Sequence, residues 1–596
     1  MHAVRLLSTL FVTFVYFSTS LAQLPLPNST YLPPNASFGV QHVNDSQKSS
    51  VDPHWSSLLG NLLWFYEAQR SGKLPSNKRV PWRNDSAVED GRDAGLDLSG
   101  GYYDAGDYVK YTYPLSFSLM SICWGAVDFG GGYDSANQTA YLDDMLRWGL
   151  DWLIKAHPSP NTLFVQVGDG DVDNAYWGGD LGIPTPRTSY QINETSPGTD
   201  AAAQASAAFS ACSALYANHS LSSVSNPASL TNISYASTLL SHAQQLYTFA
   251  TNTTERTYQT SVPVSGQAYA SSGFTDELTL ASLFLSLASN SSQLYSQAVS
   301  DYQNFHLDEQ IRPGSESVFN WDGKSPGIVV LGAQIAKMYP NLASSSTSVN
   351  WTLEAEDYLD GIVKGRGRTF LTDGGLLWYP GDSNDASLNP ALNAALLLTR
   401  YATSNLPPSS QRNSYLTFAQ SQLNYTLGAN PMNVPYIVGT HPNSPQNPHS
   451  AIATGASPYD IANIDTVPEH ERYVLYGAVV GGPDTRDRFW DLRSDWVQGE
   501  VALDYNAPLL SLVAYTIMNQ TTATQEPVFV SIEEGSYVKP KNSPCDDAVK
   551  TGCGIHPWPK GAKIAFAVVI TIVGLIILGF GTYWIVLATR NSTKVG

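Results

Sequence analysis

Apolar residues recur at helical spacing through most of the chain. Between residues 142 and 153, small or apolar side chains repeat at i, i+3, i+4, i+7, i+8 and i+11, which is one face of a helix. Strand-like alternation is scarce. The pattern predicts an all-α domain of about twelve helices over residues 54–525. The other helical segments are expected to begin near residues 56, 111, 200, 236, 276, 292, 326, 350, 388, 412 and 506.

Two architectures fit about twelve consecutive helices. Six helical hairpins could close into an (α/α)6 toroid, or the same hairpins could stack as an open solenoid. The chain shows no internal repeat of fixed period, which a solenoid would favour. Only the toroid would bring the first and last hairpins side by side.

The N-terminus is typical of a secreted protein. Arg5 precedes an apolar stretch, and small residues before Gln23 suit cleavage, so residues 1–22 are interpreted as a signal peptide. An uncleaved anchor is the alternative, because Ser and Thr interrupt the apolar stretch. Residues 23–53 are rich in Pro, Asn and Ser without periodicity, which predicts a solvated leader.

The C-terminus predicts a membrane anchor. Residues 526–562 read as a polar, Pro-containing stalk, and residues 563–589 are almost uninterrupted apolar sequence. A run of about 25 residues can cross a hydrocarbon layer of about 30 Å. We expect a single-pass type I plasma-membrane protein with an extracellular catalytic domain and a cytoplasmic stub at 590–596. A buried core helix and a cleaved lipid-anchor signal are the alternatives.

Composition limits the classes of molecule that the protein is expected to bind. Charged residues make up 14% of the chain and the formal net charge is −19, which argues against a nucleic-acid partner. The 33 Tyr and 14 Trp offer flat faces for sugar rings, although large cores also collect aromatic residues. We therefore expect a monomer that binds a neutral polymer.

Covalent features agree with a secretory route. Cys545 and Cys553 lie close together and are expected to pair, whereas Cys123 and Cys212 could be buried free thiols or a bridge. No Cys/His spacing typical of a metal site occurs. Asn-x-Ser/Thr motifs that could be glycosylated recur along the chain, among them Asn28, Asn35, Asn84, Asn137, Asn232, Asn252, Asn350 and Asn424.

Two stretches carry candidate acid–base chemistry. Asp104 and Asp107 lie among Gly and Tyr residues, where mutual repulsion would raise at least one pKa unless water bridges the carboxylates. Glu500 precedes an apolar run and is surrounded by aromatic residues, which suits a protonated general acid. If these acids are not catalytic, they could instead cap the N-termini of helices or interact favourably with a helix dipole.

These stretches resemble glycoside hydrolase family 9, the cellulase family of endo-β-1,4-glucanases. The segment Phe489-Trp490-Asp491, then Trp496, then Glu500 to Ala507, fits the family's C-terminal signature at every position. The segments at 66–75 and 165–171 are also similar, and the resemblance covers about 54–520. It implies an (α/α)6 barrel and hydrolysis with inversion.

The resemblance also assigns roles. It implies that Asp107 is the general base, that Asp104 helps to hold the water and that Glu500 is the general acid. The expected substrate-binding residues are His449, Tyr505, Tyr103 and Asp491.

The segment from Ser272 to Leu278 resembles the family's calcium segment, with a later carboxylate downstream. The expected ligands of a structural Ca²⁺ are Ser272, Gly273, Asp276, Glu277 and Asp322. The plain alternative is that Asp276 and Glu277 only begin a helix.

Some positions depart from the family. Ala451, Asn174 and Asn389 stand where relatives commonly carry Arg, His and Arg. We expect cleavage of internal β-1,4-glucosidic bonds in cellulose or related β-glucans. Mixed-linkage glucan is the alternative substrate, and a non-catalytic cell-wall-glucan-binding protein is the alternative class.

Overall fold

A computed structural model describes most of the chain. The described residues are 23–27, 30–33, 53–312, 317–455, 463–519, 526–537, 539–553, 571 and 573–586. The chain divides into one compact unit that ends at Lys541 and a second that begins at Asn542. The helical ring, the strands and the candidate site residues all lie in the first unit.

A closed ring of helices forms the inside of this unit. Each inner helix packs on the next, and α18 packs on α2, so that the ring closes. Small residues permit this close approach, and every residue of the Ala-rich α5 is buried. The inner helices are α2 (Thr112–Ser135), α5 (Thr199–Tyr216), α8 (Thr275–Ser289), α11 (Ser325–Met338), α14 (Leu388–Thr403) and α18 (Leu503–Met518).

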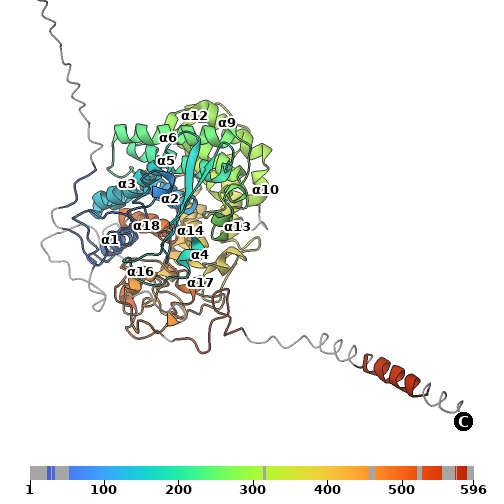
Figure 1. Cartoon of the computed structure of the whole chain (residues 1–596). Helices are drawn as coiled ribbons and strands as arrows, with labels where there is room; N and C mark the ends of the chain where they lie inside the picture. Colours follow the sequence, from blue (N-terminus) through green and yellow to red (C-terminus); the bar gives the residue numbers. More distant parts are fainter. Residues whose placement is uncertain are drawn as a thin grey trace, which may run out of the picture. The chain divides into compact units, whose positions relative to one another are not determined.

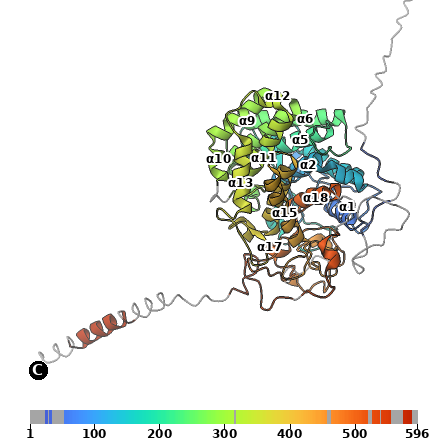
Figure 2. The same cartoon turned by 180° about the vertical axis from the view of Figure 1, so that it is seen from behind.

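A second layer of helices covers the ring. Each outer helix pairs with one inner helix, and α1 supplies the partner of α18. In Figures 1 and 2 the outer helices α3, α6, α9 and α13 follow one another around the periphery. The outer helices are α1 (Pro53–Ala68), α3 (Thr139–Ala156), α6 (Ile233–Asn252), α9 (Ser292–Asn304), α13 (Trp351–Val363) and α15 (Ser409–Thr426). This arrangement confirms the (α/α)6 toroid and excludes the open solenoid.

Short elements fill the connections between the helices. β1 (Lys110–Tyr111), β2 (Thr162–Val167) and β3 (Ser189–Asn193) form an antiparallel sheet, and β4 (Phe370–Leu371) pairs with β5 (Leu377–Trp378). The sequence pattern missed these strands because they are too short for alternation to stand out. The short helices are η2 (Arg92–Ala94), α4 (Gly170–Asp173), α7 (Tyr258–Ser261), η3 (Pro263–Gln267), α10 (Leu307–Ile311), α12 (Pro340–Ala343), η4 (Asp382–Asn384), α16 (Ala451–Thr454), α17 (Trp496–Gly499) and η6 (Val528–Ser531).

A polar network crosses the centre of the ring. Arg400 on α14 donates from Nε to Asp128 Oδ2 on α2 at 2.9 Å, and both side chains are at most 1% exposed. Gln334 on α11 donates to the other Asp128 oxygen at 2.8 Å and accepts from Trp124 Nε1 at 2.9 Å. The guanidinium also lies over the Trp124 ring at 3.9 Å. One buried network therefore ties three inner helices together.

Both disulfides are formed. Cys123 on α2 pairs with Cys212 on α5, which settles the alternative that the sequence left open. Cys545 pairs with Cys553 in the second unit, as predicted. A bridge that closes a loop of 89 residues restricts the unfolded chain considerably.

The described parts of the two terminal segments pack against the helical domain, whereas the sequence predicted a solvated leader and a polar stalk. In the predicted solvated leader, Leu24 N donates to Asp143 Oδ2 at 2.6 Å, and Tyr31 Oη donates to the Ser57 carbonyl at 2.8 Å. After residue 525, where the sequence predicts a stalk, Phe529 is buried and Tyr537 Oη donates to the Phe489 carbonyl at 3.0 Å. The compact unit thus includes parts of both segments.

The predicted membrane span at 563–589 lies largely outside the described residues. Its described part is residue 571 and a helical stretch at 573–586. No helix within the described part of the chain has both the length and the apolar character needed to span a bilayer.

Candidate active site

The three predicted catalytic acids meet at the end of the ring where inner helices begin, here called the catalytic face. Asp104 and Asp107 lie just before β1 and α2, and Glu500 lies between α17 and α18. Leu503 N, at the start of α18, donates to the Asp104 carbonyl at 3.0 Å. Ring closure therefore joins segments from opposite ends of the domain.

Gly106 is the point of contact between these segments. Its carbonyl accepts from Ala451 N at 2.8 Å, and its N–H lies close enough to Glu500 to lower the pKa of that carboxyl. A Cβ at this position would lie 2.1 Å from the His449 carbonyl oxygen. His449 in turn forms a parallel bridge with Glu500. Only glycine allows the three segments to approach this closely.

The environment of Glu500 suits a general acid. Its pKa is raised to about 8, chiefly by burial and also by the negative charge of Asp107, while the Gly106 N–H opposes the increase. A carboxyl with this pKa is protonated at neutral pH and can donate a proton to a leaving group. The bridge between His449 and Glu500, and the bond from Ala451 N to the Gly106 carbonyl, place the two acids at one site.

Asp107 has the features of a general base. Its Oδ1 is shielded from solvent and has no hydrogen-bond partner among the described residues. Burial raises its pKa well above the usual value, and the charges of Asp173 and Asp104 add to the increase. The nearby Val109 N–H opposes this effect and lowers the Asp107 pKa. An oxygen without a partner can accept a proton from water.

Asp104 is held by a residue that the sequence analysis missed. Tyr269 Oη donates to Asp104 Oδ2, and the Tyr269 ring packs edge-on against Trp321 at 4.9 Å. Burial raises the Asp104 pKa well above its usual value, and the Tyr269 hydrogen bond lowers it. Tyr269 lies only three residues before Ser272, but no spacing in the sequence connects it with Asp104.

Asp173 is a second residue that the sequence did not identify as part of the site. It is buried at the end of α4, and both carboxylate oxygens accept from Tyr108 N at 3.3 Å. Tyr108 directly follows Asp107, so the Asp173 charge acts next to the base. Burial raises the pKa of Asp173 itself to about 6.

Replacing Asp173 with Asn should move the acid limb of the pH profile to lower pH. Asn keeps an oxygen for Tyr108 N but removes the charge that raises the Asp107 pKa. Asp107 would then remain ionised, and active as a base, at lower pH. The measurement is kcat/KM against pH on a soluble cello-oligosaccharide. Asp171→Asn, at an exposed acid of the same loop, is the matched control, and an unmoved limb in Asp173→Asn would contradict the assignment.

Two predicted substrate-binding residues lie next to the acids. His449 is half-buried, and its Nδ1 donates to the Arg493 carbonyl. Burial lowers the His449 pKa, so the ring is neutral and its Nε2 is an acceptor. Tyr505 is half-buried in the first turn of α18, near Glu500. Both side chains can therefore reach a sugar at the acids.

The other two predicted substrate-binding residues have supporting roles. Tyr103 is completely buried and its Oη donates to Ser86 Oγ at 2.8 Å, so it supports the loop from beneath and does not contact substrate. This corrects the prediction for Tyr103. The Asp491 carboxylate accepts from Gln446 N and Asn447 N at 3.0 Å and fixes the loop that leads to His449.

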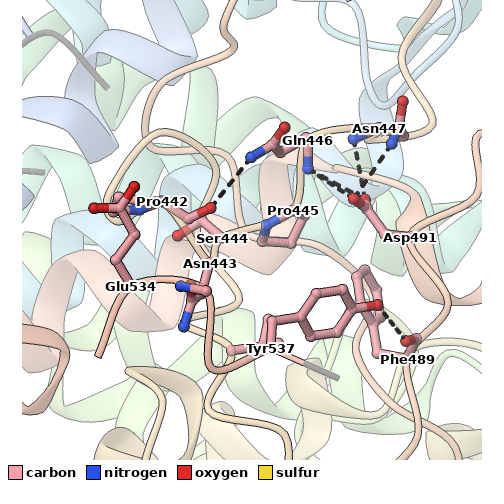
Figure 3. Close-up of a pocket in the computed structure, with 12 residues that line it drawn as sticks. Pro442, Asn443, Ser444, Pro445, Gln446, Asn447, Phe489, Asp491, Glu534 and Tyr537 are labelled. Carbon is pink, nitrogen blue, oxygen red and sulfur yellow. Dashed lines mark hydrogen bonds between the residues drawn. The ribbon is translucent and has the colours of Figure 1, made fainter. Parts of the chain in front are cut away.

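Asp491 also lines a pocket of about 420 Å³. Figure 3 shows the pocket between the loop from Pro442 to Asn447 and the segment that carries Glu534 and Tyr537. The pocket is bounded by residues after 525, so the C-terminal segment helps to shape this part of the surface.

The predicted calcium segment is next to the start of α8. Glu277 Oε1 accepts from Lys324 Nζ at 3.0 Å and from Tyr113 Oη at 2.7 Å, whereas its buried Oε2 has no partner among the described residues. Asp276 Oδ2 accepts from Lys324 N at 2.7 Å, and Asp322 Oδ1 accepts from Ser272 N at 2.7 Å.

The described residues contain no ready-made group of three His, Cys, Asp or Glu side chains that could hold a metal ion. A cation here would need backbone carbonyls from Ser272 and Gly273 as well. The buried Glu277 oxygen without a partner is nevertheless the kind of hard donor that calcium prefers.

Comparisons with known proteins agree with this site. The model of "Glycosyl hydrolase family 9" matches residues 55–513. Endoglucanase 13 of Arabidopsis thaliana is 36% identical over 494 residues, which cover 79% of this chain and 95% of the relative. Endoglucanase A of Bacillus pumilus is 35% identical over 472 residues, 79% of this chain and 67% of the relative.

Solved structures show the same fold. The endoglucanase of the termite Nasutitermes takasagoensis superposes with a TM-score of 0.67 at 34% identity, covering 78% of this chain and 98% of the termite chain. Endoglucanase CelQ from Clostridium thermocellum, complexed with cellotriose, has a TM-score of 0.66 at 27% identity, with 78% and 71% covered. With its acids gathered at one end of a closed helical ring, the chain belongs to glycosyl hydrolase family 9 and is an endoglucanase that hydrolyses β-1,4-glucan bonds.

Proposed function

We propose that the protein is a secreted, membrane-tethered enzyme that cuts internal β-1,4-glucosidic bonds at the cell surface with inversion. One observation carries the catalytic part: the segment of Glu500 and His449 packs on Gly106, one residue from Asp107, whose Oδ1 has no partner among the described residues. A base and a protonated acid thus face one site from different segments.

The residues divide the reaction between them. Asp107 takes a proton from a water molecule, and the water oxygen attacks the anomeric carbon as the bond to the leaving oxygen breaks. Glu500 gives its proton to that leaving oxygen. Asp104, held by Tyr269, orients the water. Attack from the side opposite the leaving group inverts the anomeric centre.

Cellulose-type chains are the proposed substrate. Solved relatives were crystallised with cellobiose and cellotriose, which are β-1,4-linked glucose units. Mixed-linkage glucan is the second candidate, favoured by Ala451 and Asn174 at positions where relatives carry cationic side chains. Asn389 contributes nothing to this choice, because it is buried and donates to the Asp504 carboxylate at 3.1 Å.

Reducing-sugar release decides between the two substrates. Carboxymethylcellulose should be cut with a higher kcat/KM than mixed-linkage glucan. The reverse order would favour the second candidate, and no release from either glucan would leave only a binding function.

The described residues 573–586 support the proposed tether. Within this helical stretch, large apolar side chains are exposed to solvent, among them Leu575, Ile576, Ile577, Leu578, Phe580 and Trp584. A helix that exposes this many large apolar side chains favours a lipid environment. The full-length protein should stay in the membrane pellet after alkaline carbonate washing and be released by detergent. Release by carbonate alone would contradict the tether.

Removing calcium should lower the melting temperature without disturbing the acids. The oxygen donors around Glu277 join the start of α8 to the loop before α11, so an ion there stabilises the fold. A chelator should lower the Tm by on the order of 5 °C, and calcium should restore it. Asp322→Asn should abolish this response. An unchanged Tm in wild type would contradict the calcium site.

A further inference from the structure

Asparagines of the Asn-x-Ser/Thr type mark the turns at the ends of three inner helices. Asn137, Asn218 and Asn290 follow α2, α5 and α8, with positive φ angles of 55°, 60° and 52°. All three are exposed. Their hydroxyl partners two residues later are Thr139, Ser220 and Ser292.

Helix capping explains the asparagines but not the hydroxyl residues. Asn tolerates a left-handed backbone at the end of a helix better than most residues. Asn405 does the same after α14, with φ 58°, but it is followed by Leu406 and Pro407 and forms no such motif. The left-handed turn itself therefore does not require a Ser or Thr two residues later, although Thr139 Oγ1 donates to Asp134 Oδ1 at 2.6 Å and Ser220 Oγ donates to the Ser222 carbonyl at 2.7 Å.

Two more motifs start outer helices at the same end. Asn232 Oδ1 accepts from Tyr235 N at 3.0 Å at the start of α6, and Asn350 Oδ1 accepts from Leu353 N at 3.3 Å at the start of α13. In both, the side-chain oxygen caps the helix, and no described residue accepts from Nδ2. Asn232 N also donates to the Tyr216 carbonyl at 2.8 Å, which places it at the end of α5.

These five asparagines lie on the face of the ring away from the acids, here called the distal face. The inner helices begin at the catalytic face, so their last residues lie at the opposite end. At about 1.5 Å per residue, the inner helices α8, α5 and α2 are roughly 22–36 Å long, so each carries the chain that far from the catalytic face. Contacts agree, because the His219 and Tyr339 rings, just after α5 and α11, lie 6.2 Å apart.

The motif at Asn84 is placed differently. It lies beside Arg83, whose buried Nε pairs with Asp180 at 2.9 Å. Asn84 Nδ2 donates to Asp180 Oδ1 at 2.9 Å and to the Trp82 carbonyl at 3.4 Å. A sugar on Nδ2 would leave one amide hydrogen for two acceptors.

We propose that the distal face carries N-linked glycans at Asn137, Asn218, Asn232, Asn290 and Asn350, and that Asn84 stays unmodified. Transfer from a lipid-diphosphate-linked oligosaccharide forms the bond between Nδ2 and the sugar C1, and breaks the C1–oxygen bond to the diphosphate. The lipid diphosphate leaves and one amide proton is lost. The motifs at Asn252, the last residue of α6, and Asn424, near the end of α15, lie at the other end of outer helices, and the proposal concerns the five distal sites alone.

The proposal rests on the secretory route but not on the catalytic assignment. The full chain is expressed in a eukaryotic secretory host, and each asparagine is scored by peptide mass spectrometry after treatment with a peptide-N-glycosidase, an amidase that hydrolyses the Cγ–Nδ2 bond and converts glycosylated Asn to Asp. The five distal sites should be converted, and Asn84 and Asn405 should not. Thr139→Ala, Ser220→Ala and Ser292→Ala keep the turn asparagine and should each lose one glycan.

Activity and the mature N-terminus are measured on the same sample. Removing the glycans should leave hydrolysis of a soluble cello-oligosaccharide unchanged. If most of the five sites are unmodified, or if Asn84 is modified, the proposal is overturned even when the enzyme is active. An inactive sample with the expected glycan pattern would support the proposal and count against the catalytic roles alone. An uncleaved N-terminus with no glycan anywhere would refute the secretory route.

Discussion

Glu500→Gln should lower kcat/KM by roughly 10²–10⁴-fold, the usual contribution of a positioned general acid. Gln has nearly the same shape and can still lie beside the Gly106 N–H, but it has no proton to give to the leaving oxygen. Cellotriose binding, measured by calorimetry, should persist because the loops around the site are unchanged. Activity and affinity together therefore test the role of the proton alone.

Glu89→Gln, at an exposed acid paired with Arg92, is the control and should keep wild-type activity. Full activity in Glu500→Gln would contradict the general-acid role. A wild-type protein that binds glucan and never cleaves it would instead establish the non-catalytic alternative.

Arg400→Met should lower the free energy of unfolding by about 3–5 kcal/mol, because it leaves the buried Asp128 carboxylate without its charged partner. Burial raises the Asp128 pKa to about 6 even though the Arg400 charge opposes the increase. The measurement is denaturant-induced unfolding followed by tryptophan fluorescence.

Arg92→Met, at a pair in which both side chains are at least 72% exposed, should cost at most about 1 kcal/mol. Adding Asp128→Asn to Arg400→Met should recover part of the loss, since no unpaired charge remains in the ring. Equal, small losses at both pairs would show that the network contributes little to stability.

The ring and the acids were predictable because local patterns specify them. The face of α3 that buries Leu142, Met145 and Leu150 is the face that the sequence spacing gives. Asp107 and Glu500 lie in motifs whose spacing identifies them, and closure of the ring brings those motifs together.

The remaining parts of the site depend on contacts between distant segments. The hydrogen bond from Tyr269 to Asp104 spans 165 residues, and the bonds from Tyr108 to Asp173 connect separate loops. Nothing local distinguishes these side chains from other tyrosines and aspartates. Tyr103 was misassigned for the related reason that a motif does not show which of its side chains are buried.

The catalytic face is assembled from loops that precede helices. Asp104 and Asp107 precede α2, Tyr269 precedes α8, and Glu500 precedes α18. The packed ring fixes where these helices begin, so residues that are remote in sequence approach one another with little freedom. Stability of the ring and geometry of the site are therefore linked.

The anomeric configuration of the first products tests the central claim most directly. Nuclear magnetic resonance during hydrolysis of a cello-oligosaccharide, read before mutarotation, should show the new reducing end as the α-anomer, because water activated by Asp107 attacks opposite the bond that Glu500 protonates. Release of the β-anomer would mean that a carboxylate had attacked the sugar directly, and would contradict the roles assigned to both acids.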